Sequence, residues 1–409
     1  MLAEMMQSDA GAAERVETFL ADFDHRSSFF QSHFFNITRV IWDKAPVLES
    51  QRHDGFKVVS GFSVTQRISQ SPGDFPSSND TQSIPRSKAL PRLIPSVTNP
   101  PEHGFYRSAL NPQFTPARIG RLEEEVKARA TELLTSAIEA GRAELIRDIA
   151  MPLTGLTSLG LFGVEPDDWP IYNDALHNGT YEIGTFEERQ EGWQRYADAA
   201  AATVKERLRK PVPDTVIAAL SAYEKDGRRL TEEEISEALN NLIIGGLGTT
   251  QAVMGTATVW LARNPERRQE LIDHPELIPA ATNEFIRVFS PAPFSGRTVA
   301  RDIEVEGHQF REGEAVLLFR SGSNMDPAFI ERPTEVDFRR SSSRLLSLGL
   351  GPHLCLGQHL ARLELRVYLT TLLRLAPDFE VVDEGLRLPP NFGAGLAYTE
   401  VPMAFASRR

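Results

Sequence analysis

The sequence has almost no cysteine: Cys355 is the only one in a chain of 409 residues. One thiol cannot close an intramolecular disulfide, and alone it cannot build a cysteine-rich zinc or iron–sulfur site. Long apolar runs are also lacking, because stretches such as 242–247 are far shorter than the roughly 20 residues that span a bilayer. The first residues carry neither the basic start nor the apolar segment of a signal peptide. These absences predict a soluble cytoplasmic protein.

Positive charge is in short supply as well. The sequence has 44 Lys and Arg residues against 56 Asp and Glu residues, and the net charge of −12 argues against a nucleic acid or an anionic membrane as partner. A Gly-x-Ser-x-Gly elbow, a Walker loop and a His-Glu-x-x-His pair are all missing. With 41% hydrophobic and 24% charged residues, the composition is that of a globular protein, which excludes disordered, collagen-like and coiled-coil classes.

Apolar residues recur at helical spacing over much of the chain. This periodicity predicts helices over 122–140, 191–209, 231–264 and 279–289, and a last one from about Cys355 to Leu375. A strand-like region covers 297–319, so the expected fold class is mainly α with a smaller β region. Residues 69–101 are rich in Ser, Pro, Asn and Gln and predict a long irregular loop that is functional or mobile, or alternatively a linker between two domains.

The surroundings of Cys355 are more informative than the residue alone. Gly349, Gly351 and Pro352 predict a turn that lets the backbone pass close to something flat or bulky. Apolar residues at helical spacing over 356–367 then predict a packed helix, so the cysteine lies where a turn enters a helix. The helix dipole favours a thiolate there, as a nucleophile or as a metal ligand. The alternative is a buried cysteine that acts as a small hydrophobic residue.

The spacing of Gly349, Gly351, His353, Cys355 and Gly357 resembles the haem-binding loop of the cytochromes P450. The regions 243–287 and 349–362 look most like the soluble bacterial class that includes camphor hydroxylase. The resemblance implies a single cytochrome P450 domain over residues 1–409, a helix-rich triangular prism with haem b between a distal and a proximal helix. It also implies that Cys355 is the metal ligand.

A second motif of that family has its counterpart upstream of the cysteine loop. Glu284 and Arg287 resemble the Glu-x-x-Arg motif, and Arg340 corresponds to the later arginine that completes its structural network. A Glu and an Arg three residues apart share one face of a helix, so the two side chains can pair. Without the cysteine loop downstream, the same residues would be read as an ordinary surface ion pair.

Four cationic or hydrogen-donating residues match the family's haem-propionate positions. His103 and Arg107 lie one helical turn apart, and Arg297 and His353 match two further positions. Donors of this kind are what two propionates require. Taken one by one, each would be read as solvated surface.

The segment Asn240–Gln251 resembles the distal helix that passes over the haem. A glycine inside a helix costs about 1 kcal/mol relative to alanine, so Gly245 points to a close approach, either to haem or to another helix. Thr249 matches the family's catalytic threonine, but Gly248 stands where the family usually has an acid. The resemblance implies that proton delivery runs through water or the substrate, that peroxide or another reaction is used, or that the chain is an engineered variant.

The substrate pocket is expected to be largely apolar. Asn241 shares a helix face with Gly245, Gly248 and Thr249, so it either hydrogen-bonds a substrate or bonds within its own helix. By resemblance, the loop 69–96 would close over the site. The residues expected to line the pocket are Asn241, Ile244, Pro293, Phe294, Ser295 and Leu396, with Ala394 nearby.

The resemblance implies a haem-thiolate monooxygenase that inserts one oxygen atom of O2 into a medium-sized, mostly apolar substrate of terpenoid or aromatic type. The chain has no flavin or iron–sulfur segment, so electrons are expected from NAD(P)H through a ferredoxin reductase and a ferredoxin. Arg344, Arg362 and Arg366 would suit an acidic ferredoxin, although surface arginines are common. The alternatives are a peroxygenase, isomerase or dehydratase of the same fold, or a haem-binding sensor without catalysis.

Overall fold

The computed structural model describes residues 16, 18–20, 22–78, 84, 92–340, 345–389 and 395–406. The chain forms two compact units, each assembled from separate segments of the sequence. The first unit comprises Met1–Gly104, Asn283–Cys355 and Asn391–Leu396, and the second comprises Phe105–Thr282, Leu356–Pro390 and Ala397–Arg409.

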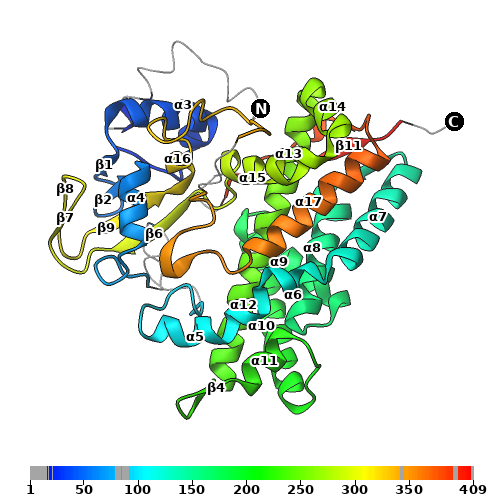
Figure 1. Cartoon of the computed structure of the whole chain (residues 1–409), viewed down its shortest axis with the longest axis horizontal. Coiled ribbons are helices and arrows are strands. Elements are labelled where there is room, and N and C mark those ends of the chain that lie inside the picture. The colour runs from blue at the N-terminus through cyan, green and yellow to red at the C-terminus, as the bar shows by residue number, and fades with distance from the viewer. Residues whose placement is uncertain are drawn as a thin grey trace. The chain divides into compact units, whose positions relative to one another are not determined.

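The first unit is organised around a four-stranded sheet. Strand β1 (Val47–Ser50) pairs antiparallel with β2 (Phe56–Val59), β2 pairs parallel with β9 (Ala315–Phe319), and β9 pairs antiparallel with β6 (Phe294–Thr298). Apolar residues of β2 and β9 pack with α4 (Phe62–Ser69), which lies against the sheet (Figure 1). The remaining elements are α3 (Ser28–Lys44), the hairpin β7 (Ile303–Val305) and β8 (His308–Phe310), and α16 (Arg320–Ser323).

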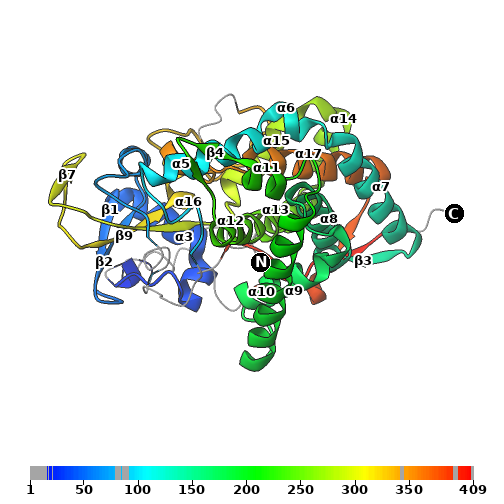
Figure 2. The ribbon, with the colours of Figure 1, turned by 90° about the horizontal axis from the view of Figure 1, so that it is seen from below.

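The second unit is almost entirely helical. Helices α7 and α17 run side by side (Figure 1), and α9 packs against the longer α10 (Figure 2). The helices here are α6 (Pro116–Gly120), α7 (Glu123–Glu139), α8 (Met151–Phe162), α9 (Trp169–Thr180), α10 (Phe186–Arg209), α11 (Val216–Ala222), α12 (Glu232–Gly246), α13 (Gly248–Arg263), α14 (Pro265–Asp273) and α17 (Gln358–Leu375).

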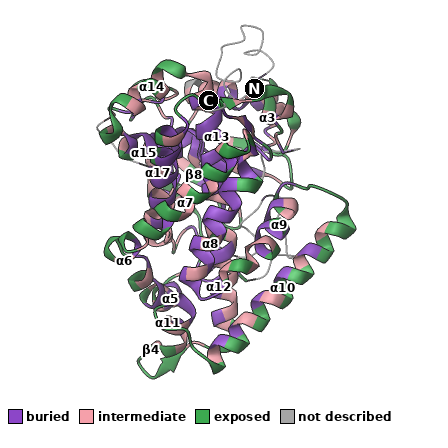
Figure 3. Cartoon of the chain, turned by 90° about the vertical axis from the view of Figure 1, so that its right-hand side faces the viewer, coloured by how far each residue is buried: buried purple, intermediate pink, exposed green. Residues whose placement is uncertain are grey.

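Short strands complete the second unit. Strand β11 (Pro402–Ala404) lies between β10 (Glu380–Val381) and β3 (Arg142–Glu144), and β4 (Glu224–Lys225) forms a hairpin with β5 (Arg228–Arg229). Helices α5 (Glu102–Leu110) and α15 (Ile278–Val288) each contain a point at which the chain passes from one unit to the other. The mainly α fold class with a smaller β part is confirmed. Figure 3 shows that α8 and α13 are largely buried, whereas α10 exposes one side.

The predicted helices occur, with two differences at their ends and one internal break. Helix α10 begins earlier, at Phe186, because Thr185 and Glu188 form a capping box. The predicted helix 231–264 is broken at Leu247, whose ψ is −69° and which stands between glycines that weaken the helix. Helix α17 begins at Gln358, so the prediction that it starts near Cys355 was wrong by three residues.

Candidate functional site

Cys355 lies in a loop of the first unit that two glycines shape. Gly349 and Gly351 have φ angles of +71° and +64°, which glycine adopts without strain. A Cβ on Gly351 would lie 2.6 Å from the Ser69 carbonyl oxygen, so a larger residue does not fit there. The Cys355 N–H donates a hydrogen bond of 2.7 Å to the Leu348 carbonyl oxygen and so closes the loop. The thiol is therefore held at a fixed point of the loop.

The loop joins α17 without continuing as a helix. Cys355 is half-buried, and Gly357 occupies the position before the first residue of α17. A Cβ on Gly357 would meet no described atom within 4 Å, so this side of the loop is open. The thiol precedes the helix instead of lying in its first turn. The backbone N–H of Cys355 is already hydrogen-bonded to Leu348 within the loop, so it is not one of the unpaired N–H groups of a helix N-terminus.

Two arginines of the first unit carry positive charge into its interior. Burial lowers the pKa of both guanidinium groups, that of Arg297 to about 10, where the charge of Arg320 contributes. Arg297 donates to the Gly296 carbonyl at 2.7 Å, and Arg320 donates to the carbonyls of Ala292 and Phe294 at 3.1 and 3.0 Å. Among the described residues, neither forms an ion pair with a carboxylate. Such charges call for an anionic group from a ligand.

Arg320 was not anticipated from the sequence. It follows the last residue of β9 directly, and a thiolate at Cys355 acts to raise its pKa against the effect of burial. Its Nε is buried without a hydrogen-bond partner among the described residues. The signal available in the sequence was a charged residue placed directly after the apolar strand 315–319.

His103 and His353 lie together in the first unit. Their ring centroids are 4.6 Å apart and the rings are tilted by 59°. His103 is buried and His353 is half-buried. Arg107, which belongs to the second unit, is half-buried one turn after His103 on α5. The structure therefore brings His103 and His353 together, and Arg107 lies on the same short helix as His103.

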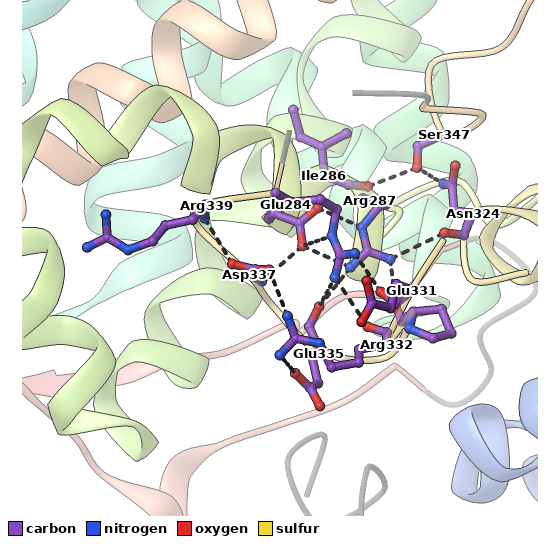
Figure 4. A network of polar contacts seen from close by, with 12 residues as sticks. Glu284, Ile286, Arg287, Asn324, Glu331, Arg332, Glu335, Asp337, Arg339 and Ser347 are labelled. Atoms are coloured by element: carbon purple, nitrogen blue, oxygen red, sulfur yellow. Dashed lines mark hydrogen bonds and ion pairs between the residues drawn. The ribbon is translucent and has the colours of Figure 1, made fainter. Parts of the chain in front are cut away.

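Glu284, Arg287 and Arg340 form one buried network (Figure 4). Two guanidinium nitrogens of Arg287 bind the two Glu284 oxygens at 2.7 and 2.9 Å, and Arg340 donates to Glu284 at 3.1 Å. Arg287 is only 1% exposed, so this is not an ordinary surface ion pair. It also donates to the carbonyls of Pro333 and Glu335 at 2.6 and 2.8 Å.

The same network reaches the start of the cysteine loop. Arg287 donates to the Asn324 carbonyl at 3.3 Å, and the Asn324 side chain accepts from the Leu346 N–H at 2.6 Å. The Ser347 hydroxyl donates to the Ile286 carbonyl at 2.9 Å. The segment that leads into the cysteine loop is thus tied to α15 from both sides.

In the second unit, one face of α12 and of the first turn of α13 is open. A Cβ on Gly245 or Gly248 would meet no described atom within 4 Å, so packing against another helix does not explain either glycine. The Thr249 hydroxyl donates to the Gly245 carbonyl at 2.8 Å. Residues 242 and 243 and Leu247, on the other side, are buried. The open face consists of Asn241, Ile244, Gly245, Gly248 and Thr249.

The other predicted pocket residues belong to the first unit. Pro293 and Leu396 are buried and Ser295 is half-buried. The Phe294 ring stacks on Phe319 with centroids 4.9 Å apart. Phe294 is therefore anchored on one side by an aromatic cluster. Ala394, much of the loop 69–96 and Arg344 lie outside the described residues.

The two described arginines near the start of α17 differ in their pairing. Arg366 forms two hydrogen bonds of 2.9 Å with Glu123, which lower the pKa of that carboxyl. Arg362 donates to the side chain and carbonyl of Gln358 at 2.9 and 3.2 Å. One of the two described arginines of the expected cationic patch is thus paired with a carboxylate.

Two stretches of the described chain are long and apolar enough to cross a membrane by length and composition. They are Leu145–Phe162 and Glu232–Arg263. In the most apolar 18 residues of each stretch, 78% and 72% of the residues are buried inside the structure. Such burial is typical of core helices in a soluble protein.

Among the described residues, no cluster of three or more His, Cys, Asp or Glu side chains could hold a metal ion.

Comparison with known proteins gives a consistent result. The family described as "Cytochrome P450" matches residues 182–385. The "Putative cytochrome P450 YjiB" of Bacillus subtilis (strain 168) is 31% identical over 311 residues, covering 72% of this chain and 78% of the relative. The "Steroid C26-monooxygenase" of Mycobacterium tuberculosis (strain CDC 1551 / Oshkosh) is 30% identical over 330 residues, covering 78% and 87%.

Solved structures agree with these relatives. A mutant of P450 EryK in complex with erythromycin B superposes with a TM-score of 0.83 at 26% identity, covering 93% of this chain and 98% of the other. P450BioI in complex with an acyl carrier protein ligated to hexadec-9Z-enoic acid gives a TM-score of 0.82 at 26% identity, covering 93% and 100%. The likeness therefore extends over nearly the whole chain.

Proposed function

The chain belongs to the cytochrome P450 family and is a P450 monooxygenase that uses haem and O2; on that premise we propose that it hydroxylates a medium-sized, mostly apolar substrate of terpenoid or aromatic type. Electrons come from NAD(P)H through a reductase and a ferredoxin. One observation carries the proposal most directly: Cys355 is held in a loop whose glycines leave no room for a side chain, and its thiolate interacts electrostatically with the half-buried cation Arg320.

The residues present fit a haem. Arg297 and Arg320 are half-buried cations without a carboxylate partner among the described residues, which suits the two propionates of the group. The open face of α12 at Gly245 suits a flat ligand, because no described side chain fills it. In the proposed site, the Cys355 thiolate would be the protein ligand of the haem iron. The residues that hold the group are His103, Arg107, Gly245, Arg297, Arg320, Gly349, His353 and Gly357.

Haem with a thiolate ligand supplies the activation of O2. The chain's own residues bind and orient the reactants. Thr249, whose hydroxyl donates to the Gly245 carbonyl, offers its lone pairs to a proton donor on the open face. Gly248 leaves room there for water. Asn241 offers an amide to a polar group of the substrate, and the apolar walls are Ile244, Pro293, Phe294 and Leu396, with Ser295 between them.

The network of Glu284, Arg287 and Arg340 has a positioning role in this proposal. It ties the segment before the cysteine loop to α15 through Asn324 and Ser347. A thiolate ligand must be held rigidly, because the electron density it donates depends on its bond to the iron. The network supplies that rigidity.

A ferredoxin would approach the surface near Cys355. Arg362 and Arg344, the latter outside the described residues, are the candidate cations of that surface, since Arg366 is paired with Glu123. The electrostatic contribution to docking is therefore expected to be modest and dependent on salt. The protein is proposed to act in the cytoplasm, where reduced nicotinamide and ferredoxin are available.

The absorption spectrum of the reduced protein with carbon monoxide tests the haem-thiolate site. The wild type is expected to show the Soret shift of a thiolate ligand, and Cys355→His is expected to lose it. A wild-type spectrum without this shift would end the proposal.

Turnover then separates the possible reactions. Product formed with NAD(P)H, ferredoxin and reductase supports the monooxygenase. Product formed only with peroxide would identify a peroxygenase, and product without any reductant an isomerase or dehydratase. Haem binding without product from a broad substrate panel would favour a sensor.

A further inference from the structure

The hairpin β4–β5 carries an arginine that the proposed mechanism does not use. Arg228 follows the turn at Asp226 and Gly227, whose φ angles of +53° and +76° are those of a tight two-residue hairpin loop. Its guanidinium carbon lies 4.0 Å from the centre of the Phe105 ring and 5.5 Å from that of the Tyr106 ring. Both rings belong to α5, which lies beside the hairpin (Figures 1 and 2). The hairpin therefore contacts α5 through one cation.

The same guanidinium group takes part in a polar cluster at the start of α12. It donates to Glu234 at 2.5 Å and to the Tyr106 hydroxyl at 3.2 Å, and that hydroxyl donates to the same Glu234 oxygen at 2.7 Å. The other Glu234 oxygen accepts from the Thr231 N–H in the capping box of the helix. Tyr106 is 1% exposed and the Glu234 side chain 14%, so this is not an ordinary surface ion pair. These four residues all belong to the second unit.

The contacts with Phe105 and Tyr106 fix more than the distance of α5 from the hairpin. Neighbouring residues of a helix point about 100° apart around its axis, so a group that contacts both rings also fixes the rotation of the helix about that axis. Arg107 is the next residue of the same helix. The direction in which Arg107 leaves α5 is therefore set by the contacts that Arg228 makes.

Glu234 places this cluster at one end of the open face of α12. It lies seven residues before Asn241, which is nearly two turns, so the two residues share a side of the helix. Gly245 follows on that side one turn later, and a Cβ there would meet no described atom within 4 Å. Tyr106 and Arg228 therefore bind α5 to the helix whose open face is proposed to receive the haem.

We propose that Arg228 is a positioning residue for the haem and that it acts through α5 on Arg107. The inference rests on the proposed function, in which Arg107 holds the haem and Gly245 faces it. Arg228 sets the direction of Arg107 through its contacts with the two aromatic rings. Through Glu234 it also sets the place of α5 against α12. The arginine itself touches neither substrate nor cofactor in this scheme, so its effect reaches the haem only through α5.

The first test needs no turnover. It measures the rate at which haem leaves the purified ferric protein for an excess of apomyoglobin. Arg228→Gln is expected to speed haem loss about tenfold, as the loss of a group that orients a ligand typically does. The matched control is Arg229→Gln, because Arg229 is the next residue of β5 and pairs with Glu224 where the side chains are 68% and 47% exposed. The control should lose haem at the wild-type rate, and an equal rate in Arg228→Gln would contradict the proposal.

The second test decides whether Arg228 acts through Arg107. Arg107→Leu removes a charged hydrogen-bond donor and is expected to speed haem loss by itself, at least about tenfold. In that background Arg228→Gln should add little, because the residue that it positions is gone. A role confined to the stability of the hairpin would give factors that multiply in the double variant, and this result would overturn the proposal.

The same measurements separate this inference from the proposed function. A wild-type rate in Arg107→Leu would remove Arg107 from the proposed haem site, and the inference with it. Faster loss in Arg107→Leu without any change in Arg228→Gln would contradict only the role of Arg228.

A second variant guards against misfolding. Should Arg228→Gln fail to fold, Arg228→Lys keeps the charge but lacks the planar group that contacts both rings. It must then lose haem faster than the wild type, and the difference must disappear in the Arg107→Leu background. A wild-type rate in Arg228→Lys would in that case contradict the proposal.

Discussion

In the proposed site, Gly248 takes the position at which we expect the family's distal acid. No described atom lies within 4 Å of the place of its missing Cβ, so the position accepts a side chain without displacing another. The helix N-terminus at this position also favours a carboxylate over a neutral group. A small acid is therefore tolerated here on steric and electrostatic grounds.

We expect Gly248→Asp to raise the product formed per electron consumed, because an acid beside Thr249 shortens the path of the proton. Gly248→Asn has nearly the same size and no acidic proton, and it is the matched control. The ratio of product to NAD(P)H is measured for both under identical ferredoxin supply. Equal coupling in the Asp and Asn variants would contradict the role given to the acid.

Arg320 provides a second prediction for a single residue. If it holds a propionate, Arg320→Leu loses a hydrogen bond to a charged group, worth about 1.5–3 kcal/mol, or roughly tenfold to hundredfold in haem affinity. The ligand-free protein also loses the bonds from Arg320 to the Ala292 and Phe294 carbonyls, but it is relieved of a cation that has no carboxylate partner among the described residues, so we expect its stability to change less than the haem affinity. Titration of the apoprotein with haem measures the affinity, and thermal unfolding of the apoprotein measures stability.

The control for this prediction is Arg301→Leu. Arg301 is 65% exposed and pairs with Asp74, so its removal should change neither quantity by much. Equal haem affinity of Arg320→Leu and the wild type would remove Arg320 from the site.

Elements were predictable from the sequence where local signals agree. Periodic apolar residues located α7 and α15, since each helix buries one face. The break at Leu247 was missed because two glycines lower helix propensity without fixing where a helix ends. Arg320 was missed because its significance depends on a neighbour distant in the sequence, Cys355, which no local pattern reveals.

The link between α15 and the segment 324–347 yields a prediction at the level of the element. Glu284→Ala leaves the guanidinium groups of Arg287 and Arg340 buried without their carboxylate. Breaking a buried ion pair in this way costs about 3–5 kcal/mol, and haem retention should fall with it. The free energy of unfolding is measured by chemical denaturation.

Glu335→Gln is the control for this change. Its side chain pairs with Arg332 where both are 56% exposed, while its backbone carbonyl serves Arg287 unchanged. A surface pair of this kind contributes at most about 1 kcal/mol. Similar losses in the two variants would show that the network adds no rigidity beyond a surface pair.

At the scale of the whole molecule, each unit contains a histidine that folding keeps neutral. Burial lowers the pKa of His25 in the first unit and of His177 in the second to about 4. The His25 ring packs edge-on against Phe294 at 5.1 Å, and the His177 ring against Tyr181 at 5.2 Å. With His25 only 4% and His177 only 9% exposed, both rings are largely shielded from the water that would solvate a positive charge.

Acid should therefore destabilise both units. The folded pKa lies below the unfolded value of about 6.5, so the unfolded chain binds more protons and stability falls as the pH drops through this interval. Between pH 7.5 and 5, each histidine is expected to remove about 2 kcal/mol from the free energy of unfolding. Denaturation curves at both pH values measure the loss. His25→Phe and His177→Phe should each reduce the difference between the two pH values by that amount, whatever their effect at pH 7.5, and an unchanged difference in both variants would assign the acid sensitivity to other groups.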